Sequence, residues 1–206
     1  NSNVDQQKIS SENNKQLIYK ISFAGQLIKR KGVDALLNAL ANFDHGNWEL
    51  NIIGDGPERK NLENQATHLK IDSNIRWYGS IENTQVRELM QQSHLFVLPS
   101  LDDGWGAVVN EALMAGVPVI ATSVSGSSVV VQSSGYGEVV NAGNELELYT
   151  AIERMREKYY FNDDRLRLEI QDWSQCIQGE SGAAYFLSIM ADVYGDGGRP
   201  AVPWET

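Results

Sequence analysis

Short apolar runs alternate with segments of helical periodicity along the middle of this chain, and this alternation constrains the fold more than any other feature. In residues 33–41, for example, apolar residues recur every three or four positions, as on the buried face of a helix. Strands that alternate with helices of about 10–15 residues form βαβ units. The sequence therefore predicts an α/β fold, a doubly wound parallel Rossmann-like sheet of about six strands with helices on both faces.

The predicted elements are short and follow one another closely. The predicted strands are Leu17–Ala24, Trp48–Ile53, Ile75–Tyr78, Leu95–Leu98, Val117–Ala121 and Gly137–Val140. The predicted helices lie at 33–41, after Pro57, around Val86 and Met90, and at Ala107–Ala115, Leu146–Arg156, Arg165–Cys176 and Ala183–Tyr194.

The two ends of the chain lack this pattern. Nine of the first fifteen residues are Asn, Gln or Ser, and such a segment buries too little apolar surface to offset its ordering entropy. We therefore expect a disordered linker at residues 1–15, one Rossmann-like domain at 16–194 and an unpatterned tail at 195–206.

Composition excludes several classes of protein. The 206 residues include 17 basic and 27 acidic ones, and this net charge of -10 argues against nucleic acid as the main partner. The single cysteine excludes an intramolecular disulfide, and the three histidines lack the spacing of metal ligands, so no metal is expected. The longest nearly apolar stretch, Ala107–Ala121, falls short of the ~18 apolar residues of a membrane span.

Ligands of doubly wound sheets bind beyond the carboxyl ends of the strands. The first predicted strand is followed by Gly25 and then by three consecutive basic residues at 29–31. Gly25 allows a ligand or another backbone to approach closely, and the helix that follows offers free N–H groups to an anion. Lys31 could supply the positive charge that a diphosphate needs. A solvated basic loop is the alternative interpretation of this segment.

A second candidate site follows the fourth predicted strand, where residues 99–106 lead into a helix. Asn110 and Glu111 are the only polar residues between Ala107 and Ala121. An ionised carboxylate in apolar surroundings is costly unless it is hydrogen-bonded, so we expect Glu111 to bind donors such as the hydroxyls of a ligand. A buried structural glutamate, capped by backbone N–H groups, is the alternative.

Asp103 precedes Glu111 by eight residues. If most of that interval is helical, the two acids lie about 10–12 Å apart along the axis. This distance matches the reach from the ribose of a nucleotide sugar, across its diphosphate, to the hexose. The diphosphate would then lie over the helix N-terminus, which favours anions. Asp102 and Asp103 could also suggest a metal pair, but nothing else in the sequence supports one.

These segments resemble the donor-binding signature of the group 1 glycosyltransferases of the two-domain GT-B kind. That family carries the pattern P-S-x-x-E-G-F-G-x-x-x-x-E-A-x-x-x-G-x-P-V-I, which residues 99–120 follow with Asp for the first Glu and Trp for Phe. Upstream, residues 25–32, 53–57 and 79–81 are similar to the family's G-R-L-x-x-x-K-G, V-G-x-G-P and G-x-V turn. Downstream, residues 125–126 and 135–140 resemble its glycine turn and closing strand, so the resemblance covers residues 17–158.

The resemblance implies the C-terminal, nucleotide-sugar-binding half of a retaining glycosyltransferase that needs neither a metal nor a cofactor. It implies that Glu111 holds the ribose hydroxyls and Asp103 the hydroxyls of the donor sugar, as the two acids of the catalytic site. It also implies that the sugar and phosphate face the backbone N–H groups of Gly104, Trp105 and Gly106.

The same resemblance assigns the rest of the donor site. It implies that Lys31 neutralises the diphosphate, that Gly25 lies beside it, and that the main chain of Ser80 and Ile81 meets the base.

Three positions depart from the family pattern. Gln26 stands where the family usually has an arginine that grips the phosphate, and Arg30 is the candidate to replace that cation. Asp103 is one methylene shorter than the family's glutamate, so the sugar must sit closer to the chain. Val129 falls where many members have an acid in the loop after Gly126.

The resemblance also implies partners. A UDP-sugar is the favoured donor and a GDP-sugar the next, the acceptor is a glycan or is lipid-linked, and the missing N-terminal GT-B domain supplies the acceptor site. The implied location is cytoplasmic, with peripheral contact to the inner face of the membrane through the missing domain. Alone, this half is expected to bind donor but to transfer sugar poorly. The alternatives are another GT-B-fold sugar-nucleotide enzyme, such as an epimerase, and a degenerate non-catalytic module that binds a protein partner.

Overall fold

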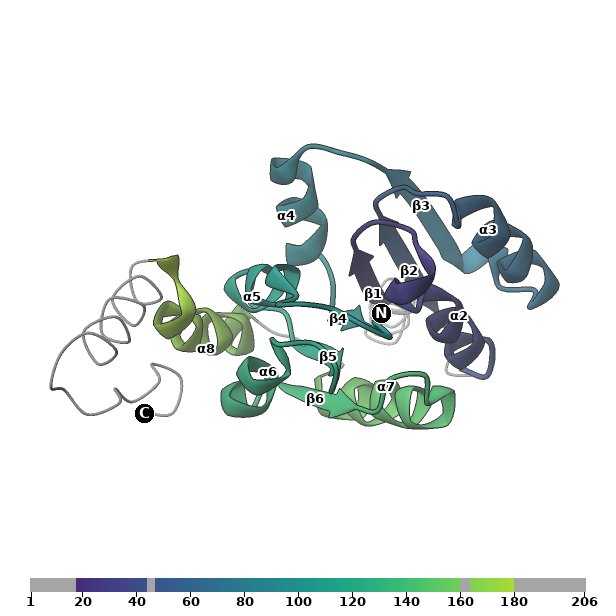
Figure 1. Cartoon of the computed structure of the whole chain (residues 1–206). Helices are drawn as coiled ribbons and strands as arrows, with labels where there is room; N and C mark the ends of the chain where they lie inside the picture. Colours follow the sequence, from purple (N-terminus) through teal and green to yellow (C-terminus); the bar gives the residue numbers. More distant parts are fainter. Residues whose placement is uncertain (1–17, 44–46, 160–163, 180–206) are drawn as a thin grey trace, which may run out of the picture.

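The computed structural model describes residues 18–43, 47–159 and 164–179 (Figure 1). Six strands form one sheet in the order β3-β2-β1-β4-β5-β6, and every neighbouring pair is parallel. The predicted doubly wound parallel sheet is thereby confirmed. The strands are β1 (Tyr19–Ala24), β2 (Trp48–Ile53), β3 (Ile75–Gly79), β4 (Leu95–Leu98), β5 (Val119–Thr122) and β6 (Gly137–Val140).

The helices cover the sheet on both faces. Figure 1 shows α2, α3 and α7 on one side of the sheet and α4, α5, α6 and α8 on the other. Their bounds are α2 (Val33–Ala41), α3 (Arg59–His68), α4 (Asn83–Gln91), α5 (Ala107–Met114), α6 (Ser128–Ser134), α7 (Glu145–Tyr159) and α8 (Asp164–Ser174). Three short 3-10 helices complete the described chain, η1 (Lys29–Lys31), η2 (Asp72–Asn74) and η3 (Gln175–Ile177).

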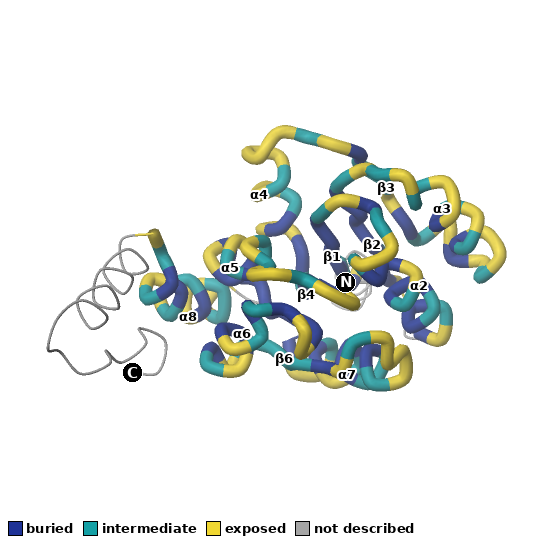
Figure 2. The backbone as a smooth tube through the Cα atoms, in the orientation of Figure 1, coloured by how far each residue is buried: buried dark blue, intermediate teal, exposed yellow. Residues whose placement is uncertain are grey.

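The core lies between the sheet and these helices, and the four central strands β2, β1, β4 and β5 are almost entirely buried (Figure 2). All four residues of β4 and all four of β5 are buried, which explains why these strands read as continuous apolar runs rather than as alternating ones. On α2, the predicted stripe packs as expected, since Leu36, Leu37 and Leu40 are buried.

The structure differs from the sequence prediction at two places, β5 and α6. β5 starts at Val119 rather than at Val117, because Pro118 has no N–H and the Val117 N–H donates to the Ala112 carbonyl at the end of α5. The helix α6 was not predicted, since its run of three valines has the β-branched composition of a strand. Burial of Val130 and Val131 overrides that preference. The predicted linker, the predicted tail and the predicted helix at 183–194 lie outside the described residues.

His94 extends the pairing of β1 with β4 through its side chain. The Lys20 N–H donates to the His94 Nδ1 atom at 3.0 Å, and the His94 N–H donates to the Lys20 carbonyl at 2.8 Å. Burial, with the positive charges of Arg167 and Lys20, lowers the pKa of His94 from 6.5 to about 4. A neutral ring is therefore part of the fold.

We expect the stability of the fold to fall between pH 6.5 and about 4 because of His94. The pKa of His94 is lower in the folded chain than in the unfolded chain, so its contribution is complete above the unfolded pKa and is lost as the pH falls through the folded one. Partial solvent screening limits the loss to about 1–2 kcal/mol. Thermal unfolding across this pH range measures it. In His94→Asn the Oδ1 atom can accept the same N–H without titrating, so parallel curves for the two proteins would remove His94 from the explanation.

Candidate functional site

Main-chain hydrogen bonds tie together the carboxyl ends of β1, β2 and β3. The Gly25 N–H donates to the Ile53 carbonyl at 2.9 Å, and the Gly54 N–H donates to the Gly79 carbonyl at 2.8 Å. A Cβ atom on Gly54 would lie 2.0 Å from the Gly25 carbonyl oxygen, so no residue with a side chain fits there. Backbone rather than side chains therefore forms this edge of the sheet.

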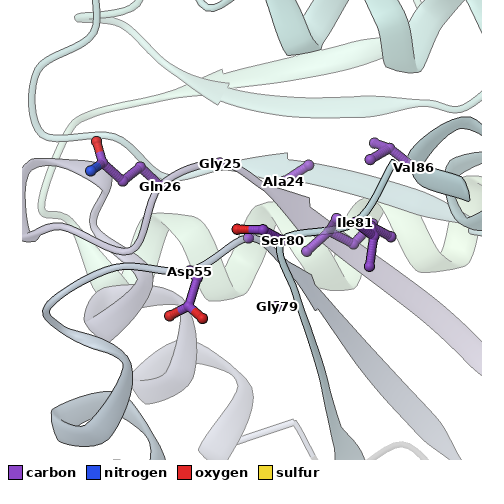
Figure 3. Close-up of a pocket in the computed structure, with 10 residues that line it drawn as sticks. Ala24, Gly25, Gln26, Asp55, Gly79, Ser80, Ile81 and Val86 are labelled. Atoms are coloured by element: carbon purple, nitrogen blue, oxygen red, sulfur yellow. The ribbon is translucent and has the colours of Figure 1, made fainter. Parts of the chain in front are cut away.

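A cavity of about 420 Å³ opens at this edge (Figure 3). It is lined by Ala24, Gly25, Gln26, Ile53, Gly54, Asp55, Gly79, Ser80, Ile81 and Val86. Four of the residues assigned by resemblance, Gly25, Gln26, Ser80 and Ile81, thus come together in one place. Figure 3 shows Ile81 and Val86 at one end of the cavity and Gln26 at the other.

Asp55 is the acidic residue of this cavity, and its carboxylate is already engaged. It accepts a hydrogen bond from the Gly56 N–H at 2.7 Å and pairs with an Arg59 guanidinium nitrogen at 3.3 Å. In Figure 3 the carboxylate points away from Ser80. Among the described residues that line the cavity none is basic, which agrees with the loss of the family's arginine at Gln26.

Lys31 and Asp103, 72 residues apart in the chain, form an ion pair at the same edge of the sheet. The Lys31 Nζ atom lies 2.6 Å from an Asp103 carboxylate oxygen, and the two side chains are only 13% and 10% exposed. The Ser100 hydroxyl donates to the same oxygen at 3.2 Å. Asp103 is therefore held in one position by two donors.

The backbone explains why these two residues meet. Gly32 has a φ of 65°, in the left-handed region, and a Cβ atom there would lie 2.1 Å from the Pro99 carbonyl oxygen. Next to this contact, the Leu101 N–H donates to the Arg30 carbonyl at 2.7 Å. The turn after η1 is thereby fastened to the loop after β4, and Lys31 faces Asp103.

Arg30, the candidate replacement for the missing arginine, lies farther from Asp103. Its guanidinium donates to the Asp102 carbonyl at 3.2 Å and lies 4.0 Å from an Asp103 carboxylate oxygen. Its side chain is 49% exposed, so it can turn toward a ligand at little cost. It does not line the cavity of Figure 3.

The loop from Asp103 to Gly106 leads directly into α5. Gly106 is the N-terminal cap residue of this helix, in a left-handed conformation with a φ of 70°. Trp105 is 49% exposed, and its loop lies beside Asp103. The helix N-terminus thus opens close to the Lys31–Asp103 pair, as the placement of an anion there requires.

Glu111 is not buried, although its apolar neighbours in the sequence predicted that it would be. It is exposed, and it lines a separate groove of about 190 Å³ between α4 and α5, together with Arg87, Gln91, Met114 and Ala115. The expectation of a carboxylate buried among apolar groups was wrong, because α5 buries one face only, through Val109, Ala112 and Leu113. Because α5 begins at Ala107, only part of the Asp103–Glu111 interval is helical.

Ser100 and Gly32, which hold the ion pair together, were not predicted as site residues from the sequence. Ser100 was visible as the second residue of the P-S pair, and Gly32 as the end of the K-G pair, but neither pair reveals a contact to a distant segment. In the described ranges, no group of three or more His, Cys, Asp or Glu side chains is placed to hold a metal ion. Within the same ranges, no helix is both long enough and apolar enough to cross a membrane.

Comparisons with known proteins agree with the fold. The chain is 27% identical over 182 residues to an uncharacterized glycosyltransferase of Methanocaldococcus jannaschii, a match that covers 81% of this chain and 49% of that protein. Its fold is similar to that of sucrose-phosphate synthase from Thermosynechococcus elongatus, with a TM-score of 0.72 and 21% identity over 86% of this chain and 46% of that one.

A further solved structure, Anabaena HepE in complex with UDP, superposes with a TM-score of 0.66 at 22% identity, over 82% of this chain and 46% of that one. The chain thus spans about half the length of each of these three proteins. Its fold is that of one Rossmann-like half of a GT-B glycosyltransferase. The family model described as glycosyl transferases group 1 matches residues 4–170, and the chain therefore belongs to the group 1 glycosyltransferase family.

Proposed function

We propose that this chain is the donor-binding part of a retaining, metal-independent glycosyltransferase that takes its sugar from a nucleoside diphosphate sugar. The proposal rests on one observation, that three features lie next to one another at the carboxyl edge of the sheet. These are the backbone-lined cavity, the Lys31–Asp103 pair and the N-terminus of α5. A nucleotide sugar needs a cavity for its base, positive charge and free N–H groups for its diphosphate, and a hydrogen-bond acceptor for its sugar.

The donor would lie across these features in a defined order. Its base occupies the cavity against the main chain of Ser80 and Ile81, and its diphosphate lies near Gly25 and Lys31. The sugar meets Asp103 and the backbone N–H groups of residues 104–106. Transfer then breaks the bond between the sugar C1 atom and the phosphate oxygen, which leaves with the electron pair, while an acceptor hydroxyl bonds to C1 and loses its proton.

UDP is the proposed nucleotide and GDP the next. A similar fold has been solved with UDP, and the cavity offers main-chain groups to the base, while the carboxylate of Asp55 is engaged by Gly56 and Arg59. The proposed acceptor is a glycan or lipid-linked sugar held by the other half of a two-domain enzyme.

The ribose contact is assigned to Glu111, whose exposed carboxylate faces the groove beside α4. Glu111→Gln keeps the shape of the side chain and removes its charge. We expect the affinity for UDP to fall about 5–30-fold, because charge-assisted hydrogen bonds to the ribose hydroxyls are lost, while thermal stability stays the same. Calorimetric titrations of the wild-type chain and the variant with UDP, GDP, ADP and their glucose esters measure this.

Each outcome of these titrations decides something. Equal UDP affinity in a folded Glu111→Gln protein would remove the ribose role from Glu111. If the wild-type chain binds none of the nucleotides at millimolar concentration, the proposed donor site is wrong.

That last result would favour an interaction module, for which there is one specific observation. Leu101, Trp105 and Val124 are 43%, 49% and 42% exposed on two adjoining loops at the carboxyl edge of the sheet. Exposed apolar side chains in one area are typical of a surface that meets another protein.

A further inference from the structure

The loop that carries Asp103 rests on a second loop, which follows β5. We call residues 103–106 the glycine loop and residues 123–127 the serine loop. Asp103 pairs with Ser125 in a parallel β-bridge, and the Gly126 N–H donates to the Gly104 carbonyl at 2.8 Å. Just before these contacts, the Thr122 hydroxyl donates to the Ser100 carbonyl at 2.6 Å. The serine loop therefore backs the glycine loop along its whole length.

Two buried hydroxyls lie at the centre of this contact. Ser125 and Ser127 are 1% and 0% exposed, and their Oγ atoms are 2.8 Å apart. The Ser125 hydroxyl also points to the Trp105 carbonyl, 3.5 Å away. A Cβ atom on Gly106 would lie 2.5 Å from the Ser125 Oγ atom and 2.7 Å from the Ser127 Oγ atom. The hydroxyl pair thus occupies the space where a side chain on Gly106 would be.

Capping of α6 does not explain these hydroxyls. Ser127 is the N-terminal cap residue of α6, a position where serine usually accepts a hydrogen bond from the first turn. Its side chain makes no such bond and is directed to Ser125 instead. The hydroxyl pair is therefore committed to the glycine loop rather than to its own helix.

From this geometry we propose that Ser125 and Ser127 are positioning residues for the donor sugar. The inference rests on the proposed function. The hydroxyl pair sets the path of the backbone at Trp105 and Gly106, and with it the direction in which the backbone N–H groups of the glycine loop face the sugar. In the proposed function the base lies at Ser80 and Ile81 and the diphosphate lies near Gly25 and Lys31, so the hydroxyl pair acts chiefly on the sugar end of the donor.

The test compares two ligands that differ only in the sugar. UDP and UDP-glucose, with GDP and GDP-glucose run in parallel, are titrated by calorimetry into the wild-type chain, Ser125→Ala and Ser127→Ala. Loss of one hydroxyl removes the mutual hydrogen bond, and we expect the affinity for the glucose ester to fall about three- to tenfold while the affinity for the diphosphate changes less than about twofold.

Ser134→Ala is the matched control. Ser134 is a buried serine of α6 whose hydroxyl donates to the Val131 carbonyl at 2.8 Å, away from the glycine loop. Thermal unfolding of all variants shows how much stability each hydroxyl contributes. If a general loss of stability weakened sugar binding, Ser134→Ala would lower the ratio of the UDP-glucose affinity to the UDP affinity as well. A specific role of the hydroxyl pair therefore requires that this ratio keep its wild-type value in Ser134→Ala.

The possible results separate the two proposals. A fall in the ratio confined to Ser125→Ala and Ser127→Ala supports the positioning role. An unchanged ratio in these variants, or an equal fall in Ser134→Ala, overturns the inference and leaves the donor site standing. A wild-type chain that binds neither UDP nor GDP overturns the proposed function and the inference with it.

Discussion

Replacement of Lys31 by methionine is expected to weaken UDP binding by more than ~30-fold and to lower the free energy of unfolding by about 2–4 kcal/mol. Both effects follow from one contact. The Lys31 ammonium lies 2.6 Å from Asp103 in a place where both side chains are nearly buried. Without it, Asp103 keeps only the Ser100 hydroxyl as a close donor, with the Arg30 guanidinium at 4.0 Å. A poorly solvated carboxylate without its cation destabilises the folded state.

The double variant Lys31→Met, Asp103→Asn separates the two effects. It removes both charges, so most of the lost stability should return, whereas UDP binding should stay weak because the cation is still missing. Chemical denaturation measures the free energy of unfolding, and calorimetry measures the affinity. If the double variant is as unstable as Lys31→Met, the lost stability does not come from the unpaired charge of Asp103.

The fold could be predicted in detail because its strands carry a local signal. β2, β4 and β6 begin and end at the residues that the sequence indicated, since a glycine, a proline or a polar residue directly follows each of them. The helix α6 could not be predicted in the same way. Its valines prefer strands in isolation, and only the sheet against which they pack makes a helix the better solution.

The segments that form the site could be predicted from the sequence, but the contacts between them could not. The motifs placed Gly25, Ser80 and Ile81 at the strand ends, and the structure joins them in one cavity. No local pattern predicted that Lys31 would pair with Asp103, because that contact depends on the backbone approach of Gly32 to Pro99.

For Glu111 the local sequence pattern predicted burial of the carboxylate, and the structure shows that it is exposed. Apolar neighbours in the sequence suggested a buried carboxylate, but successive residues of a helix point in different directions. Met114, three residues further on and on the same side of α5, is 42% exposed. This side of the helix therefore remains open to solvent and to a ligand. A carboxylate here can bind hydroxyl groups without first losing a partner, which is the property that the ribose contact needs.

In the proposed site, Asp103 competes with the diphosphate of the donor for the positive charge of Lys31. The nearly buried Lys31 is already neutralised by Asp103, the acid that is assigned to the sugar. A diphosphate that approaches Lys31 must share it with Asp103 and is also repelled by the Asp103 charge. Free UDP is repelled by the Asp103 charge and gains no hydrogen bond from that carboxylate in return. A nucleotide sugar is repelled too, but its hydroxyls form hydrogen bonds to the same carboxylate. The pair should therefore favour the intact donor over the spent nucleotide.

Asp103→Asn tests this competition, because it should change the two affinities in different ways. The substitution releases Lys31 from its charged partner and removes the repulsion, so we expect UDP to bind at least about fivefold more tightly, a gain of about 1 kcal/mol or more. UDP-glucose gains the same amount but loses charge-assisted hydrogen bonds from its sugar, which are worth about 1.5–3 kcal/mol. The ratio of the UDP-glucose affinity to the UDP affinity should therefore fall about 10–100-fold. The gain for UDP should shrink as salt is added, since it is electrostatic. Weaker UDP binding in Asp103→Asn would show that the carboxylate orients Lys31 for the diphosphate instead of competing with it. An unchanged ratio would show that Asp103 does not touch the sugar.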